Sequence, residues 1–188
     1  MGKYRDKLIH QEVLFTKEEC EYLLSEHSGW GKSVVVSQTT GDWYVSSRRT
    51  SNKSITIPWS KKATDIILPK LNKLFRVTSL PREGSWVIRY NKGEYIRKHH
   101  DSGIGFYDRV LSVSIQLSSP EDYEGGEFVL YPNKETIEDN VVCDKTQGNI
   151  ISYKPEIWHE VKTVTKGTRY SLILFFRPEN YETENTLI

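Results

Sequence analysis

The stretch VLSVSIQLS, residues 110–118, alternates between apolar and polar side chains. Because successive side chains of a β-strand point to opposite faces, this alternation predicts a strand with two different faces. One face would carry Leu111, Val113, Ile115 and Leu117, and the other Ser112, Ser114 and Gln116. We expect the apolar face to lie on the core and the polar face to line a binding site.

Similar short runs of β-branched and aromatic residues surround this stretch. They are SWVIRY, EFVLYP, GNIISYK, HEVKTV and TRYSLILFF, and turn-forming segments such as NKGE, YEGGE, DKTQG and TKG separate them. Short strands at regular spacing with such turns are typical of an antiparallel sandwich or small barrel.

The first half of the chain predicts helices. FTKEECEYLLSEH has a capping-box spacing, Thr16 with Glu19, so a helix should begin near Lys17. A second helical pattern runs through WSKKATDIILPKLNKLF, where Pro69 would kink or split the helix. VSSRRTSNKS, residues 45–54, is polar and predicts an exposed loop, either solvated or in contact with an acidic substrate.

Composition limits the class of protein. The 188 residues, 37% of them hydrophobic, suit one domain, and a net charge of +1 gives no overall attraction to nucleic acid or to a membrane. Cys20 and Cys143 have no metal-binding or disulfide-framework spacing, which favours reduced thiols in a cytoplasmic protein. The N-terminus lacks an apolar signal segment and no stretch is long enough to span a membrane, so we expect a soluble chain.

YNKGEYIRKHHDSG, residues 90–103, contains a candidate metal site. His99 and Asp101 would face the same side of a strand, and His159 begins another predicted strand. Two histidines and one carboxylate leave coordination positions open, as non-haem Fe(II) requires. The alternative for the pair is an ordinary His–Asp hydrogen bond at a strand end.

GTRYSLILFF provides a candidate anchor for an anion. Arg169 and Ser171 are two positions apart and should project to one face of a strand. A guanidinium with a neighbouring hydroxyl suits a carboxylate in a dry site, where a charge-assisted hydrogen bond is strongest. The alternative for Arg169 is a structural ion pair.

These motifs together resemble the Fe(II)- and 2-oxoglutarate-dependent dioxygenases, and within them the prolyl 4-hydroxylase-like and PKHD-type hydroxylases. The resemblance covers about residues 85–178 and is carried by Tyr90, Gly93, Tyr95, His99, Asp101, YEGGEF, Gly148, WHEV and GTRYS. It implies an α+β, mainly β fold: a double-stranded β-helix (jelly roll, cupin-like) at about 85–178. Helices from residues 1–80 would pack on its outer face, and residues 179–188 would form a tail of the same single domain.

The resemblance also implies roles for particular residues. His99, Asp101 and His159 match the iron ligands, and Arg169 with Ser171 matches the receptor for the far carboxylate of 2-oxoglutarate. Tyr90 would border the cosubstrate, and Gln116 stands where some relatives have a tyrosine against the same carboxylate. The candidate substrate contacts are Arg109, Tyr95 and Trp158, whereas His100 should face solvent or orient its loop.

The implied reaction uses Fe(II), 2-oxoglutarate and O2, with ascorbate as a reductant, and releases succinate and CO2 while a C–H bond is hydroxylated. Asp101 favours hydroxylation because related halogenases lack this carboxylate. The resemblance suggests an amino-acid side chain as target, in a prolyl or other residue of a peptide or protein, or in a free amino acid.

Two other functions stay open at this point. The nucleic-acid demethylating dioxygenases carry two arginines six positions apart, whereas Arg169 and Arg177 are eight apart. A noncatalytic module, or a metal-binding cupin that uses no 2-oxoglutarate, would not need Arg169. The physiological substrate and the oligomeric state are left open by the sequence.

Overall fold

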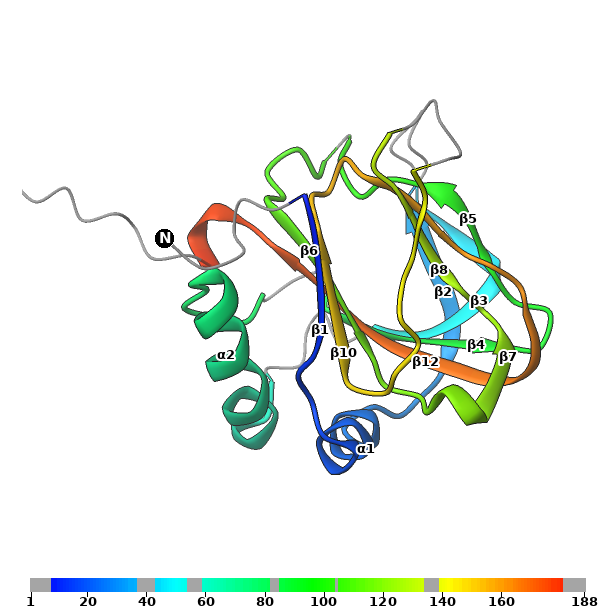
Figure 1. Cartoon of the computed structure of the whole chain (residues 1–188), viewed down its shortest axis with the longest axis horizontal. Coiled ribbons are helices and arrows are strands. Elements are labelled where there is room, and N and C mark those ends of the chain that lie inside the picture. Colours follow the sequence, from blue (N-terminus) through cyan, green and yellow to red (C-terminus); the bar gives the residue numbers. More distant parts are fainter. Residues whose placement is uncertain are drawn as a thin grey trace, which may run out of the picture.

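The structure, a computed structural model, describes residues 8–36, 43–53, 59–81, 85–103, 105–133 and 139–180. Two antiparallel sheets form its β core (Figure 1). The larger sheet has the order β1-β10-β6-β12-β4-β3-β2, with β7 paired to β12, and the smaller has the order β5-β11-β8-β9. The expected jelly-roll-like, mainly β fold is confirmed.

The strands of the larger sheet are β1 (Ile9–Val13), β2 (Gly31–Val36), β3 (Trp43–Lys53), β4 (Trp86–Asn91), β6 (Leu111–Gln116), β7 (Tyr123–Gly125), β10 (Asn149–Tyr153) and β12 (Val164–Phe176). Those of the smaller are β5 (Ile96–His99), β8 (Phe128–Tyr131), β9 (Val141–Val142) and β11 (Trp158–Val161).

Two helices lie on the outer side of the larger sheet, as predicted (Figure 1). Helix α1 (Lys17–Ser25) begins after Thr16, whose side chain forms the predicted capping box with Glu19. Helix α2 (Lys61–Phe75) runs without a break through Pro69. Both helices bury apolar side chains against the same face of the sheet.

The apolar side chains divide into two clusters on the two faces of the larger sheet. The outer cluster joins α1 and α2 to Val113 and Ile115 of β6 and to Leu172 and Leu174 of β12. The inner cluster lies between the sheets and includes Ile88, Tyr90, Phe128, Leu130, Ile151 and Tyr153. The alternation of β6 therefore has the predicted consequence: its apolar face builds the outer core, and its polar face turns inward.

Three strands of the first half were not predicted. β1 pairs with β10 at one edge of the larger sheet, and the β2–β3 hairpin extends the opposite edge by pairing with β4. The prediction of an exposed loop at residues 45–54 is wrong for the backbone of 45–53, which belongs to β3. β3 lies between β4 and β2, and its largely polar sequence lacks the apolar alternation by which strands are recognised.

The end of the described chain is fixed to the fold. The 3-10 turn η2 (Pro178–Asn180) places Asn180 where its carbonyl accepts the backbone N–H of Thr78. The rest of the expected tail, 181–188, lies outside the described residues.

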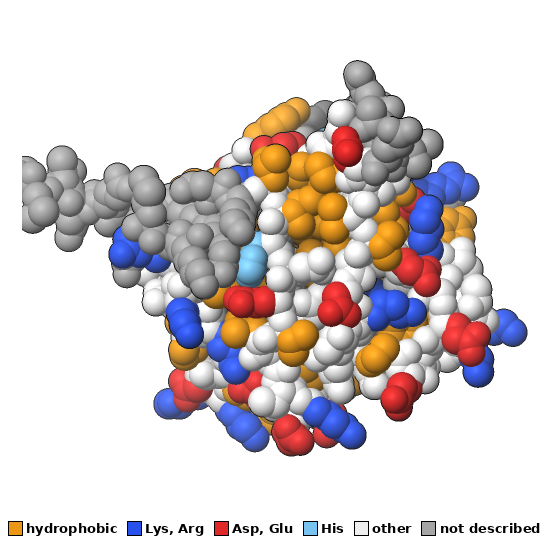
Figure 2. Space-filling model, in the orientation of Figure 1, with side chains coloured by type: hydrophobic (Ala, Val, Ile, Leu, Met, Phe, Trp, Pro, Cys, Tyr) orange, Lys and Arg blue, Asp and Glu red, His pale blue; other side chains and the backbone are white. Residues whose placement is uncertain are grey.

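On the face shown in Figure 2, basic and acidic side chains are interspersed. No helix in the described ranges has the length and apolar character needed to cross a membrane.

We predict that Gly148→Ala destabilises the fold by about 3–5 kcal/mol. The carbonyl of Gly148 accepts the N–H groups of Leu14 and Phe15, and its own N–H donates to Gln116. A Cβ there would lie 1.9 Å from the carbonyl oxygen of Phe15, at a φ of +83°. Gly93 has a φ of +85° with nothing within 4 Å of a Cβ, so Gly93→Ala should cost only about 1–2 kcal/mol of backbone strain. If urea denaturation showed that both variants lose the same free energy of unfolding, the steric argument would be contradicted.

Candidate active site

Three metal-binding side chains meet between the sheets. β11 pairs with β5 so that His159 lies opposite His99, with ring centroids 4.2 Å apart. Asp101 follows β5 directly, and its Oδ1 lies 3.5 Å from Nε2 of His159 and 3.9 Å from Nε2 of His99. The three donor atoms lie within 4.8 Å of one another, so they surround a single point.

Backbone carbonyls orient both imidazole rings. Nδ1 of His99 lies 2.8 Å from the carbonyl oxygen of Arg97, and Nδ1 of His159 lies 2.9 Å from that of Ile157. A carbonyl oxygen only accepts, so each Nδ1 carries a proton, and each Nε2 faces Asp101, where the neutral ring can offer its lone pair to a metal. This is how metal-binding histidines are usually held.

Two hydroxyl groups fix the carboxylate of Asp101. Its Oδ2 accepts hydrogen bonds from Ser112 at 2.8 Å and from Tyr153 at 3.0 Å, whereas Oδ1 faces the imidazoles. Ser112 comes from the polar face of β6 and Tyr153 from the inner face of β10. One carboxylate oxygen is thus occupied, and the other is available to a metal.

The charge state of this cluster suits a cation. Burial would raise the pKa of Asp101, but His159, His99 and Arg109 outweigh it, so the pKa lies well below its usual range. Burial, with the nearby Asp101, raises the pKa of Tyr153 well above its ordinary value, so Tyr153 remains a hydrogen-bond donor. Asp101 is therefore an anion, and hydrogen-bond donors of the protein take the place of water around its carboxylate.

The donor set fits a divalent first-row metal with open coordination positions. His159 and Asp101 are 4% and 8% exposed, so water does not compete freely for their donor atoms. A direct His–Asp hydrogen bond is the weaker explanation, because 3.5 and 3.9 Å exceed the usual range of about 2.7–3.2 Å.

Arg169 is buried on the inner face of β12, 2% exposed. Its Nη1 donates to Oγ of Ser171 at 3.2 Å, and its guanidinium lies 5.6 Å from the ring centre of Tyr90. Within the described part of the chain no carboxylate pairs with it, which disfavours a structural ion pair. A buried guanidinium without an anion is a suitable receptor for a carboxylate ligand.

Gln116 lies directly across from Ser171 in the pairing of β6 with β12. Its Nε2 donates to the phenol oxygen of Tyr123 at 3.0 Å. Neither Tyr123 nor Tyr153 was predicted as a site residue. The i, i+2 spacing of Ile151 and Tyr153 puts both side chains on one face of a strand, which is the inner face. Only the fold brings the hydroxyl of Tyr153 to Asp101.

The three predicted substrate contacts have different surroundings. Arg109 donates to the backbone carbonyl of Asp101 at 3.0 Å and lies between the rings of Phe106 and Phe175, 4.0 and 3.7 Å away. Trp158 packs its ring edge-on to His100, with centroids 4.8 Å apart. Tyr95 is half-buried before β5. Arg109 thus fixes the backbone of the segment that carries Asp101 by a hydrogen bond.

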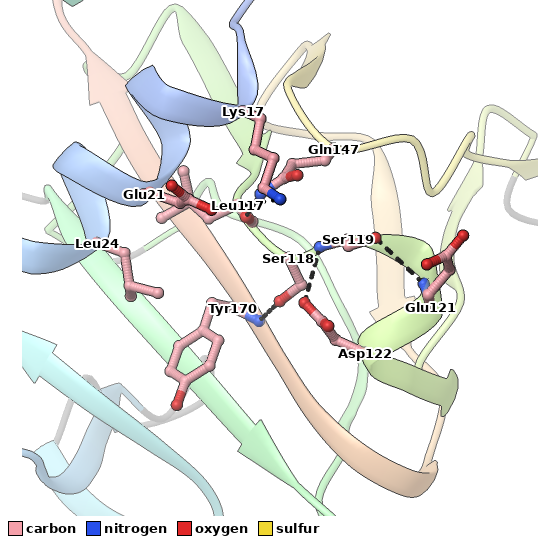
Figure 3. A pocket seen from close by; sticks show the side chains of 10 residues that line it. All are labelled: Lys17, Glu21, Leu24, Leu117, Ser118, Ser119, Glu121, Asp122, Gln147 and Tyr170. Carbon is pink, nitrogen blue, oxygen red and sulfur yellow. Dashed lines mark hydrogen bonds and ion pairs between the residues drawn. The ribbon is translucent and has the colours of Figure 1, made fainter.

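A separate hollow of about 280 Å³ lies where α1 meets the end of β6 and the middle of β12 (Figure 3). Lys17 and Tyr170 line it together with the acidic residues Glu21, Glu121 and Asp122. None of the metal-binding side chains borders it. Three carboxylates make this hollow unsuitable for a dicarboxylate ligand, so the candidate active site is the cluster between the sheets.

We predict that Ser112→Ala and Tyr153→Phe each weaken metal binding about 10-fold or more, because each removes a hydrogen bond that orients Asp101. Anaerobic titration with Mn(II) would measure this. Ser114→Ala is the matched control: Ser114 is equally buried on the same strand face, but no bond from it to Asp101 appears among the described contacts. Unchanged affinity in both variants would exclude the orienting role.

Comparison with known proteins agrees with this site. The model of the 2OG-Fe(II) oxygenase superfamily matches residues 85–177. A PKHD-type hydroxylase of Acinetobacter baumannii (strain SDF) is 28% identical over 181 residues, covering 87% of this chain and 75% of the relative.

Solved structures share the fold. A 2OG-Fe(II) oxygenase family oxidoreductase from Burkholderia pseudomallei superposes with a TM-score of 0.68 at 19% identity, covering 95% of this chain and 88% of that one. A prolyl hydroxylase from Trichoplax adhaerens, solved with a peptide fragment of the hypoxia inducible factor oxygen degradation domain, gives 0.65 at 16% identity, covering 94% and 86%. The chain belongs to the 2OG-Fe(II) oxygenase superfamily, whose enzymes use Fe(II), 2-oxoglutarate and O2.

Proposed function

We propose that this enzyme hydroxylates an unactivated C–H bond of an amino-acid side chain, in a peptide or protein or in a free amino acid. The observation that carries the proposal is the His99, Asp101 and His159 cluster together with the buried Arg169, which has no carboxylate partner among the described residues. A metal-binding cupin without a cosubstrate would gain nothing from a guanidinium buried there.

Each residue has a distinct task in this proposal. His99, Asp101 and His159 hold the iron through three donors and leave its other positions open. Arg169 and Ser171 bind the far carboxylate of 2-oxoglutarate, which fixes the direction of its reactive end. When bound, iron, 2-oxoglutarate and O2 supply the oxidising chemistry that yields succinate, CO2 and a hydroxylated product.

The apolar inner cluster supports the reaction by limiting water. Phe128 lies 5.6 Å from the ring of His159, and Tyr153 lies 4.8 Å from the same ring. Both are almost fully buried, at 6% and 2% exposure. These rings shield the metal side chains and fix their positions.

A peptide or protein substrate is favoured by the likeness to the Trichoplax adhaerens prolyl hydroxylase, which was solved with a peptide. The PKHD-type relative agrees with hydroxylation. A nucleic-acid substrate has less support. Arg177, the second arginine of the demethylase comparison, pairs with Asp108 at 3.1 Å, and charges of both signs are interspersed on the visible face (Figure 2).

We further propose that ascorbate serves as reductant, that residues 1–188 act as one domain, and that the enzyme works in the cytoplasm. Ascorbate is supported by the family resemblance alone. The single domain is supported by β1–β3 of the first half, which join the same sheet as β12. The cytoplasm is supported by Cys20 and Cys143, which are both free thiols, because cytoplasmic proteins keep their cysteines reduced.

Succinate release across a panel of prolyl peptides, other peptides, free amino acids and small acids tests the substrate class. We expect stimulation by a peptide, and loss of turnover in His99→Ala with the fold intact by circular dichroism. If only free amino acids stimulated succinate release, the substrate would be a free amino acid. Normal turnover by His99→Ala would contradict the ligand assignment.

Arg169→Lys and Arg169→Ala test the cosubstrate anchor. Lysine keeps the charge but cannot form a bidentate hydrogen bond, so KM for 2-oxoglutarate should rise about 10-fold in Arg169→Lys. Alanine removes the charge as well, so KM should rise about 100-fold in Arg169→Ala. Steady-state kinetics at saturating substrate would measure both values. An unchanged KM in the alanine variant would place the far carboxylate elsewhere.

A further inference from the structure

Tyr123 lies beside Arg169 on the interior side of the larger sheet. It opens β7, is 3% exposed, and pairs with Gly167 of β12, two positions before Arg169. A Cβ added to Gly126 would lie 3.2 Å from both Cε2 of Tyr123 and Cδ of Arg169. The phenol ring and the arginine stem therefore approach the same glycine.

Gln116 holds the phenol group of Tyr123. Its amide donates to the phenol oxygen at 3.0 Å, while on the neighbouring strand Arg169 donates to Oγ of Ser171. A hydroxyl group can accept hydrogen bonds and still donate its own proton. Tyr123 and Ser171 each accept from a neighbour, so each keeps a proton for a further acceptor.

The surroundings supply donors rather than an acceptor. Burial raises the pKa of Tyr123 and the neighbouring Arg169 guanidinium opposes this, while Lys145 lies 4.3 Å from the ring centre of Tyr123. Over the described ranges no acidic side chain pairs with Arg169, and the phenol oxygen of Tyr123 accepts from Gln116. Glu127 is near enough to raise the pKa of Tyr123, but its carboxylate pairs with Lys145 at 3.9 Å. Buried donors without an acceptor are costly unless a ligand supplies one.

We propose that Tyr123, positioned by Gln116, donates a hydrogen bond to the far carboxylate of 2-oxoglutarate, as a third donor beside Arg169 and Ser171. The inference rests on the cosubstrate site of the proposed function. In this proposal Gln116 acts on the carboxylate through Tyr123. The tyrosine thus comes from β7, outside the β6 position where the resemblance placed it.

Binding of two oxo acids to the Mn(II)-loaded protein tests this without turnover. 2-Oxovalerate has the same oxo-acid end as 2-oxoglutarate, with a methyl group in place of the far carboxylate. Tyr123→Phe should weaken 2-oxoglutarate about 10-fold in anaerobic calorimetry, since hydrogen bonds to charged groups are worth about 1.5–3 kcal/mol, and should leave 2-oxovalerate unchanged. Gln116→Leu should weaken 2-oxoglutarate about 3-fold, again without affecting 2-oxovalerate.

Tyr131→Phe is the matched control. Tyr131 is a buried tyrosine of β8 whose hydroxyl bonds to Glu160, so both acids should bind this variant as they bind the wild type. Mn(II) affinity, measured first, should be the same in all the proteins.

Two results would overturn the inference while the proposed function stands: unchanged 2-oxoglutarate binding by Tyr123→Phe, or equal weakening of both acids, which would make the tyrosine a packing residue. Gln116→Leu decides the case if Tyr123→Phe fails to fold, because an unchanged preference for 2-oxoglutarate would again exclude the proposal. If the wild type binds Mn(II) but no 2-oxoglutarate, the proposed function itself fails, and this inference with it.

Discussion

A buried carboxylate is the constraint on which this structure depends. Asp101 keeps its charge at 8% exposure because two hydroxyls hold one oxygen and two imidazoles face the other. An isolated charge in such surroundings would be strongly unfavourable. Four strands must therefore deliver partners to one point: β5 and β11 bring the imidazoles, and β6 and β10 bring the hydroxyls.

The larger sheet serves stability and chemistry with opposite faces of the same strands. In β12, Leu172 and Leu174 pack under the helices, whereas Arg169 and Ser171 turn inward. β6 divides in the same way. A one-residue shift in register would exchange these faces, burying the polar groups in hydrocarbon and exposing the core. The apolar packing of α1 and α2 therefore helps to set the register of the active-site residues.

Opposite charges divide the interior between two tasks. The anionic Asp101, with two imidazoles beside it, suits a metal cation, and the cationic Arg169, with hydroxyl neighbours, suits a carboxylate. A cosubstrate that chelates a metal at one end and carries a carboxylate at the other matches both. Tyr90 contributes to this arrangement through its ring, which lies beneath the guanidinium.

The sequence by itself determined the features that depend on local spacing. Alternation defined β6, and short β-branched and aromatic runs between turns defined β4, β8, β10 and β12. The capping box defined the start of α1, and i, i+2 spacing paired Arg169 with Ser171. Only the tertiary structure decided that Tyr153 and Ser112 hold Asp101, that Gln116 holds Tyr123, and that Arg109 braces a backbone carbonyl. Those contacts follow from the register between strands distant in sequence. The polar strand β3 was missed because its pairing with β2 and β4, rather than apolar alternation, defines it.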